Sequence, residues 1–280
     1  MTGTLYLGAT PIGNMEDITY RAVRVMREAD LIAAEDTRRT RKLLTHYDIH
    51  TPLVSYHEHN KAARGAKLIE KLTNGADIVL VSDAGLPGIA DPGTDLVRLA
   101  QAANVRVSPL PGANAALSAL ICSGLSTEMF IFVGFLPVKT KKRRELLLRL
   151  AEAEETLIIY SAPHDLRATL TELAAMLGEE RLTVLARELT KVHEEFLPAT
   201  LSDHLTYLQD ETPKGEYVIV MEGKKTEESA APAAPEDIVA LYDELIGKGA
   251  DKSEAKRETA QRLGISGREV YQAVLAAKEG

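Results

Sequence analysis

The sequence predicts an α/β fold made of two α/β domains and a small C-terminal helical bundle. Short apolar runs alternate with helical patterns over the first 223 residues. Strands separated by helices of about 10–15 residues are typical of parallel βαβ units. The chain has 280 residues, which suggests two domains at about 150 residues per domain. A polar, Ala- and Pro-rich stretch at residues 224–235 then separates these domains from a helical tail.

The composition is that of a soluble globular protein. Hydrophobic residues make up 45% and charged residues 26% of the chain, which excludes a disordered or fibrous protein. The net charge of −8 excludes a globally basic nucleic-acid binder but leaves room for a local basic patch. A single cysteine, Cys122, excludes a disulfide framework and predicts a reducing compartment. The N-terminus lacks a signal-peptide pattern, and no apolar run approaches about 20 residues, so we expect a cytoplasmic protein.

The first α/β domain is predicted to span residues 1–120. Its clearest helix covers residues 18–29, where Ala22, Val25 and Met26 contribute to an apolar stripe. Its clearest strand covers residues 77–81, a run rich in Ile, Val and Leu. The remaining patterns predict strands at 4–9, 31–34, 53–55 and 105–107, and helices at 37–46, 61–72 and 95–103.

The second α/β domain is predicted to span residues 121–223, because the pattern loosens around residues 124–128 and a second series then begins. The helical patterns in this series have the length expected of crossover helices between strands. The apolar runs predict strands at 129–134, 156–160, 183–186, 195–199 and 217–221, and the patterns between them predict helices at 140–153, 165–177 and 201–209.

The tail beyond the linker is predicted to span residues 236–280 and to hold three helices, at 236–246, 252–263 and 266–277. The break between the last two helices, with the sequence LGIS, resembles the turn of a helix-turn-helix unit. A bundle of about 45 residues has a small core, so we expect it to dock onto something else.

Three loops rich in small residues follow predicted strands: GATPIGN at 8–14, SDAGLPGIADPG at 82–93 and PGANAA at 111–116. Ligands of open α/β sheets bind at the carboxyl ends of strands, and glycine lets the backbone approach a ligand closely. Neither a G-x-G-x-x-G fingerprint nor a Walker A loop is present. The first loop could instead be a tight turn, and the third could serve close helix–sheet packing.

These loops, in this order and spacing, resemble those of the tetrapyrrole methylase-like family of S-adenosylmethionine enzymes. The resemblance continues through ARELTKVHEEF at 186–196 and KGEYVIVMEG at 214–223, so it covers roughly residues 4–223. It implies that the cofactor lies in a cleft between the two domains and that the enzyme is a homodimer. Within the family, the chain is most similar to members that methylate the ribose 2′-hydroxyl of a cytidine in 16S rRNA. This implies the small ribosomal subunit as a partner.

The resemblance also implies a set of cofactor-binding residues. Two positions depart from the family pattern: Ala90 stands where serine is usual, and the loop at 160–165 lacks a usual glutamate and arginine. A sulfonium cation needs carbonyl oxygens and a carboxylate nearby, and adenine needs small apolar walls. The residues implied are Pro11, Asp83, Gly85, Ile89, Ala90, Asn114 and Ala115 in the first domain, and Ser161, Ala162, Ala186, Gly215 and Glu216 in the second.

Methyl transfer to oxygen is a direct displacement, so alignment and desolvation should supply most of the acceleration. A ribose hydroxyl is a poor nucleophile, and a nearby base could add about 10²–10⁴-fold. The candidates lie at residues 35–39 and 187–188. We predict Asp36 or Glu188 as the proton acceptor and Arg38 as a phosphate contact. The alternative roles are helix capping for residues 35–36 and a structural ion pair for residues 187–188.

An acidic chain that binds RNA needs local positive charge, and two predicted helices carry it near their first turns. Cations there oppose the helix dipole, which suggests an external anion, although a solvated helix face is the alternative. The His57 and His59 pair has no third ligand at a meaningful spacing, so we expect no metal site and assign His57 to RNA contact. The predicted RNA-binding residues are Arg39, Arg41, Lys42, His57, Lys139, Lys141, Lys142, Arg143 and Arg144.

Two other functions compete with this one. A small-molecule methylase acting on a tetrapyrrole would use the same fold, but it needs neither the basic helices nor the tail. A ligand-sensing DNA-binding regulator would explain the tail, but the last predicted helix is short and poorly basic for a recognition helix.

Overall fold

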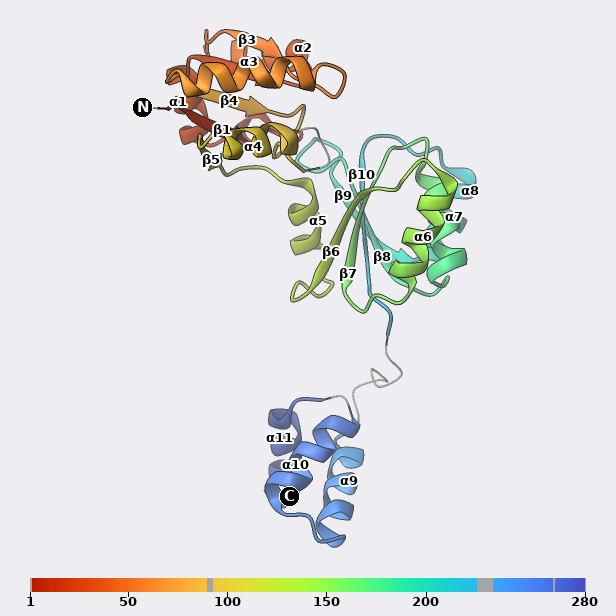
Figure 1. The fold of residues 1–280 in the computed structure, drawn as a ribbon. Coiled ribbons are helices and arrows are strands. Elements are labelled where there is room, and N and C mark those ends of the chain that lie inside the picture. The colour runs from red at the N-terminus through yellow and green to blue at the C-terminus, as the bar shows by residue number, and fades with distance from the viewer. Residues whose placement is uncertain (1, 90–92, 226–233, 264, 280) are drawn as a thin grey trace. The chain divides into compact units, whose positions relative to one another are not determined.

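The computed structural model describes residues 2–89, 93–225, 234–263 and 265–279. The chain divides into two compact units, Met1–Gly223 and Lys224–Gly280. The first unit holds two β-sheets with their helices, and the second holds three helices (Figure 1). This arrangement confirms the predicted α/β fold with C-terminal helices.

The first sheet is parallel throughout and has the strand order β3-β2-β4-β1-β5. Helices cover both of its faces, so strands β2 and β4 are buried along their whole length. The strands are β1 (Thr4–Gly8), β2 (Leu31–Ala34), β3 (Leu53–Ser55), β4 (Ile78–Val81) and β5 (Arg106–Leu110). The helices are η1 (Met15–Asp17), α1 (Tyr20–Glu28), α2 (Thr37–His46), α3 (Lys61–Thr73) and α4 (Gly93–Ala102).

The second sheet is mixed and has the order β6-β7-β10-β8-β9, with only β6 and β7 parallel. Helices α6, α7 and α8 cover one face, and α5 covers the other (Figure 1). The strands are β6 (Phe130–Phe135), β7 (Thr156–Ser161), β8 (Leu182–Arg187), β9 (Glu195–Thr200) and β10 (Tyr217–Met221). The helices are α5 (Ala115–Ser123), α6 (Thr140–Ala151), α7 (Leu166–Leu177) and α8 (Leu201–Asp210).

Helix α5 follows directly from the first sheet but packs on the second. Its buried residues Ala116, Ala119 and Leu120 join a core cluster with Ile158 of β7 and Val218 of β10. The predicted domain boundary after residue 120 therefore falls within a helix. The segment between β5 and α5, residues 111–114, is the point where the chain passes from one sheet to the other.

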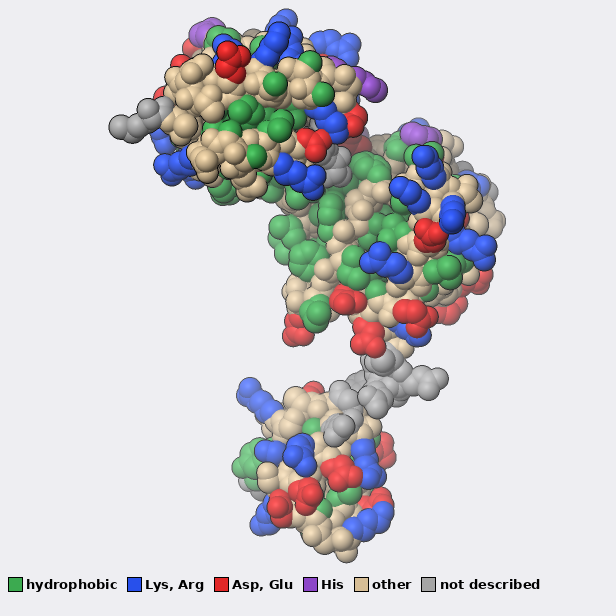
Figure 2. Space-filling view, viewed as in Figure 1, with side chains coloured by type: hydrophobic (Ala, Val, Ile, Leu, Met, Phe, Trp, Pro, Cys, Tyr) green, Lys and Arg blue, Asp and Glu red, His purple; other side chains and the backbone are tan. Residues whose placement is uncertain are grey.

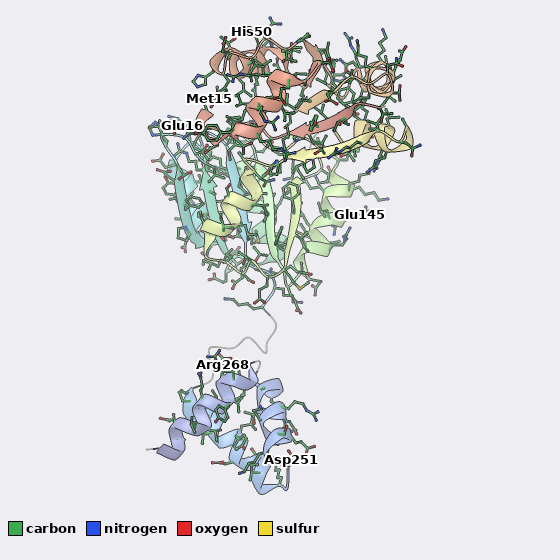
Figure 3. All side chains as sticks on the ribbon, turned by 90° about the vertical axis from the view of Figure 1, so that its left-hand side faces the viewer. Met15, Glu16, His50, Glu145, Asp251 and Arg268 are labelled. Carbon is green, nitrogen blue, oxygen red and sulfur yellow. The ribbon has the colours of Figure 1, made fainter. Side chains whose placement is uncertain are left out.

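The second unit contains α9 (Pro235–Gly247), α10 (Lys252–Arg262) and α11 (Gly267–Glu279). Its small core is built from Ile238, Tyr242 and Leu245 of α9 together with one residue from each of the other helices. Asp251, labelled in Figure 3, caps α10 by accepting hydrogen bonds from two backbone amides. Residues 226–233 of the predicted linker and Gly264 of the predicted turn lie outside the described residues. Across the described chain, every helix is too short or too polar to span a membrane.

Candidate functional site

A cavity in the first unit has a volume of about 500 Å³, and loops from both sheets line it. On the first sheet these loops follow the carboxyl ends of the parallel strands, the usual binding edge of such a sheet. The lining residues from this half are Ile12, Glu35, Arg39, Ser82, Asp83, Ala84, Gly85, Leu86, Ile89, Asn114 and Ala115. Those from the second half are Phe135, Tyr160, Ser161, Ala162, Pro163, Leu189, Glu216, Tyr217 and Val218.

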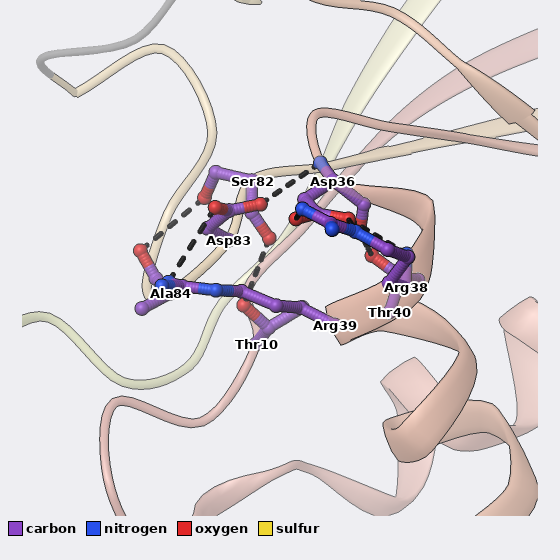
Figure 4. A network of polar contacts seen from close by, with 8 residues as sticks. All are labelled: Thr10, Asp36, Arg38, Arg39, Thr40, Ser82, Asp83 and Ala84. Atoms are coloured by element: carbon purple, nitrogen blue, oxygen red, sulfur yellow. Dashed lines mark hydrogen bonds and ion pairs between the residues drawn. The ribbon is translucent and has the colours of Figure 1, made fainter.

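The loop after β4 is held against the loop after β1 by backbone hydrogen bonds. Thr10 and Gly85 exchange two amide-to-carbonyl bonds of 2.9 and 3.0 Å. The Thr10 hydroxyl donates to the Ser82 carbonyl at 3.3 Å (Figure 4). Gly85 has a φ of +79°, a conformation that glycine adopts without strain. These bonds and the conformation of Gly85 thus hold residues 82–85 as a backbone wall beside the loop after β1.

A polar network joins the loop after β4 to the start of α2 (Figure 4). The Asp36 amide donates to Asp83 Oδ1 at 2.9 Å, and Arg39 lies 3.5 Å from Asp83 Oδ2. Asp36 is the N-cap of α2, accepting from the Arg38 amide at 2.8 Å, and it also pairs with the Arg38 guanidinium. The Arg38 hydrogen bonds lower the pKa of Asp36 to about 2. Asp36 therefore stays ionised and occupied by Arg38.

A second network fixes the loop between β8 and β9. The Glu188 carboxylate accepts from Lys191 Nζ at 2.7 Å and from the Glu216 amide at 2.9 Å. The hydrogen bond from Lys191 keeps the pKa of Glu188 below its usual value. Gly215 has a φ of +85°, and a Cβ there would lie 2.5 Å from Glu188 Cγ. The Glu188 carboxylate thus connects the loop between β8 and β9 to the segment just before β10, whose residue Glu216 lines the cavity.

The predicted cofactor residues divide into three groups. Pro11, Ala186 and Gly215 are not among the lining residues, although Ile12 and Glu216, next to Pro11 and Gly215 in the chain, and Val218, the strand partner of Ala186, are. Ala90 lies outside the described residues. Those that line the cavity are Asp83, Gly85, Ile89, Asn114, Ala115, Ser161, Ala162 and Glu216.

The predicted catalytic and RNA-binding residues are more dispersed. Arg39 lines the cavity, while Arg38, Arg41 and Lys42 line a separate shallow hollow on α2 together with Thr45 and His46. Asp36 and Glu188 do not line the cavity, whereas Glu35, from the same candidate segment as Asp36, does.

The remaining basic candidates lie at the start of α6 and after β3. Arg143 is half-buried and pairs with Glu172 of α7, which makes it a structural contact. The His57 ring contacts the Asn60 amide at 3.1 Å. The residues exposed at the start of α6 are Lys139, Lys141, Lys142 and Arg144.

Sequence reasoning did not single out several apolar lining residues, among them Ile12, Leu86, Leu189 and Val218. Their types are those of core residues, so nothing in the local sequence separates them from the core. Phe135 was also missed, although an aromatic residue beside Gly134 and Pro137 at a strand end was a visible signal.

The cavity suits an adenosyl sulfonium ligand. Its volume lies within the range of about 300–1,000 Å³ found for small-molecule sites. Glu35, Asp83 and Glu216 offer carboxylates to positively charged groups, and Ile12 and Val218 offer apolar walls to a flat ring. Among the described residues there is no cluster of three His, Cys, Asp or Glu side chains that could hold a metal ion.

Comparison with known proteins gives consistent matches over most of the chain. The family model described as Tetrapyrrole (Corrin/Porphyrin) Methylases matches residues 4–204. A protein of Synechocystis named ribosomal RNA small subunit methyltransferase I is 49% identical over 270 residues, covering 96% of both chains. Its namesake from Bacillus subtilis is 45% identical, covering 97% of this chain and 94% of its own length.

Solved structures show the same fold at low sequence identity. Diphthine synthase matches with a TM-score of 0.63 and 15% identity, covering 80% of this chain and 91% of its own. A uroporphyrin-III C-methyltransferase from Thermus thermophilus, complexed with S-adenosyl homocysteine, matches with a TM-score of 0.57 and 18% identity. That match covers 78% of this chain and 97% of the other.

Proposed function

The chain belongs to the tetrapyrrole methylase family and is an S-adenosylmethionine-dependent methyltransferase, and we propose that it methylates the RNA of the small ribosomal subunit. The observation that carries the proposal is the near-full-length identity of 45–49% to relatives named for that activity. The resemblance of the loops extends the proposal to the 2′-hydroxyl of a cytidine ribose in 16S rRNA. The reaction would then take place in the cytoplasm.

The residues of the cavity wall divide the work of binding. S-adenosylmethionine, when bound, supplies an electrophilic methyl group. Asp83, held by Arg39 and by the Asp36 amide, would offer a carboxylate to the positively charged part of the ligand. Ile12, Leu86 and Val218 would exclude water from the adenine. Alignment and desolvation of this kind account for much of the acceleration in a direct displacement.

The acceptor hydroxyl must lose a proton, and a carboxylate at the wall can accept it. Asp36 and Glu188 are the acceptors predicted from sequence, but neither is among the residues that line the cavity. Glu35 lines the cavity itself. We therefore propose Glu35 for the role, with Asp36 organising the start of α2 beside it.

Helix α2 is proposed to contact the RNA backbone. Its sequence TRRTRKLLTH contains four Lys and Arg residues and no acidic residue. Among the described residues, Arg41 and Lys42 have no ion pair or side-chain hydrogen bond. They line the hollow on α2 with Arg38, which lies one residue before the cavity residue Arg39. A phosphate chain leaving the cavity would meet this positive face first.

We also propose that a second copy of the chain covers α5 and the start of β6. Figure 2 shows hydrophobic side chains gathered over this face. Ile121 is 72% exposed and Leu117, one turn before it on α5, is 46% exposed. Met129, just before the edge strand β6, and Phe130, its first residue, are exposed as well. Apolar exposure of this kind on an ordered surface marks an interaction site.

The test is methyl transfer to RNA. The protein is incubated with methyl-labelled S-adenosylmethionine and small subunits that lack the modification, and the labelled nucleoside is identified after digestion. Label in 2′-O-methylcytidine supports the proposal, and Glu35→Gln should lose most of that label.

Two results would contradict the proposed function. If the cofactor binds but no label enters subunits or free rRNA, a small-molecule methylase becomes the leading candidate. If the protein shifts duplex DNA in a sequence-specific manner, the regulator becomes the leading candidate.

A further inference from the structure

Strand β6 contains a β-bulge at its carboxyl end, next to the cavity. Phe132 pairs with Ile158 of β7, but Gly134 pairs with Ile159, so Val133 is an extra residue in the ladder. Gly134 has a φ of +69°, which a side chain would resist. Bulges of this kind re-aim side chains and are frequent beside active sites.

The bulge changes which face of the sheet Phe135 occupies. Residues three apart on a regular strand point to opposite faces, because side chains alternate with a period of two. With the extra residue, Phe132 and Phe135 both pack edge-on against Tyr160, at centroid distances of 5.2 and 5.5 Å. The bulge therefore brings Phe135 to the side of the sheet where Tyr160 lines the cavity.

Phe135 is an exposed aromatic ring at the rim of a binding cavity. Its side chain lines the cavity, yet 60% of its surface remains exposed. Tyr160, which is largely buried, supports the ring from one side. A phenyl group in this position would be covered if its purpose were core packing, so its open surface is available to a flat partner.

Basic residues begin four positions after Phe135, at Lys139. The segment from Val138 to Lys142 is exposed, and Val138 itself is 96% exposed. Helix α6 begins at Thr140 with no acidic residue in its first turn and no side-chain cap. Among the described residues, Lys139, Lys141 and Lys142 have no ion pair, whereas Arg143 is paired with Glu172. Aromatic rings beside free cations are the combination that binds single-stranded nucleic acid.

We propose that Phe135 is the stacking platform for the base of the acceptor nucleotide, and that Lys139, Lys141 and Lys142 contact the adjoining phosphates. This inference rests on the proposed function, because it assumes a single-stranded or flipped-out RNA nucleotide as the substrate. It assigns a role to a residue at the rim of the cavity that is not among the cofactor-binding residues implied by the sequence. Stacking is tolerant of base identity, so this contact orients the nucleotide rather than selecting cytosine.

The first test uses fluorescence. The chain contains no tryptophan, so Phe135→Trp introduces a single reporter at the platform, and Tyr207→Trp introduces one on α8 as a matched control. Both variants are titrated with a single-stranded nine-nucleotide oligocytidylate and with inorganic polyphosphate, which carries charge but no base. We expect the oligocytidylate alone to quench the platform reporter, in a saturable manner, and neither ligand to quench the control. Equal responses of the platform reporter to both ligands would overturn the stacking role.

The second test separates the platform from the cofactor site. Phe135→Leu keeps an apolar side chain but removes the ring, and Phe135→Tyr restores a ring. Losing one stacked base should raise the KM for unmodified subunits by about 5- to 100-fold. The Kd for S-adenosylmethionine, measured by calorimetry, should change much less than the KM for subunits, because the ring lies at the rim of the cavity and is 60% exposed. Phe135→Tyr should recover most of the RNA affinity.

The outcomes distinguish this inference from the proposed function. If the wild-type protein methylates the subunits while Phe135→Leu keeps the wild-type KM, the platform is wrong and the function stands. If Phe135→Leu weakens cofactor binding instead of RNA binding, Phe135 belongs to the cofactor wall and the inference fails. If the wild-type protein methylates no RNA, both proposals fail together.

Discussion

Asp36 has two roles, capping α2 and pairing its charge with Arg38, and the substitution Asp36→Asn can separate them. Asparagine caps a helix about as well as aspartate, so Asp36→Asn keeps the start of α2 while removing the charge that pairs with Arg38. A carboxylate with a pKa of about 2 is a weak base at neutral pH. We expect Asp36→Asn to lower kcat less than tenfold, as measured by methyl transfer to subunits, and Glu35→Gln to lower it by about 10²–10⁴.

The reverse order of effects would identify Asp36 as the proton acceptor. Asp36→Ala is the control for the capping role, because alanine cannot accept from the Arg38 amide. Its melting temperature should fall, whereas that of Asp36→Asn should not.

Gly215 provides a second prediction at this scale. Its φ of +85° is strained for any residue with a side chain, and an alanine Cβ there would lie 2.5 Å from Glu188 Cγ, so alanine does not fit. Gly215→Ala should therefore destabilise the protein by about 1–3 kcal/mol, measured by urea unfolding. It should also weaken S-adenosylmethionine binding, since Glu216 and Tyr217 line the cavity. Gly178→Ala is a useful comparison, because Gly178 also has a positive φ but has open space around it.

At the scale of an element, α8 carries a buried histidine that makes stability depend on pH. His204 is 2% exposed, its Nε2 lies 3.0 Å from the Thr183 carbonyl oxygen, and burial lowers its pKa below 6.5. The unfolded chain then binds a proton before the folded one does. The stabilisation is complete above the unfolded pKa of about 6.5 and is lost as pH falls toward the folded pKa.

We expect the free energy of unfolding to fall as the pH drops below about 6.5, with a slope that approaches at most about 1.4 kcal/mol per pH unit through this residue. Urea titrations at several pH values measure the slope. His204→Gln should flatten that slope, and an unchanged slope would show that His204 titrates alike in both states.

Elements were easier to predict than their partners. Strand β10 and helix α2 have the predicted bounds. Strand β10 is buried on both faces and is apolar throughout, and α2 is buried on one face and has an apolar stripe, so each has a clear sequence pattern. The sequence did not predict which sheet α5 packs against, because its small apolar residues fit against either sheet. The turn of Phe135 toward the cavity depends on the extra residue Val133, and alternation over a short strand gives no sign of a bulge.

The parts of the candidate site formed by glycine- and proline-rich loops were predictable from sequence, and the parts formed by apolar side chains were not. The glycine and proline residues of the loop at 82–89 predicted a binding loop, and Asp83, Gly85 and Ile89 of this loop line the cavity. Apolar side chains such as Leu189 reach the cavity because loops from both sheets line it, a relation between distant segments that no local sequence pattern records.

At the scale of the whole molecule, the apolar face of α5 predicts an assembly. Ile121→Glu should convert a dimer into a monomer, because it places a charge at a residue that is 72% exposed and proposed to be covered by a second copy. Sedimentation equilibrium measures the change, and Ile246→Glu, on α9 of the second unit, is the control. A wild-type protein that sediments as a monomer would contradict the proposal.

The division into two units predicts that the tail is dispensable for cofactor binding. All residues that line the described cavity belong to the unit Met1–Gly223. A chain ending at Gly223 should bind S-adenosylmethionine with unchanged affinity in calorimetry. Loss of methyl transfer to subunits by this shortened chain would assign the tail to RNA binding, and loss of cofactor affinity would contradict the prediction.

The passage from one sheet to the other at residues 111–114 has a mechanical consequence. Asn114, at its end, caps α5 and also lines the cavity. A rotation of one sheet against the other would have to act through this short segment, so it would displace the cavity wall as it moved. Ligand binding in the cavity and the angle between the two sheets are therefore coupled. Anything that holds the sheets at the angle a ligand prefers raises the affinity of the protein for that ligand. A second ligand that bridged both sheets would need no direct contact with the cofactor to change its affinity.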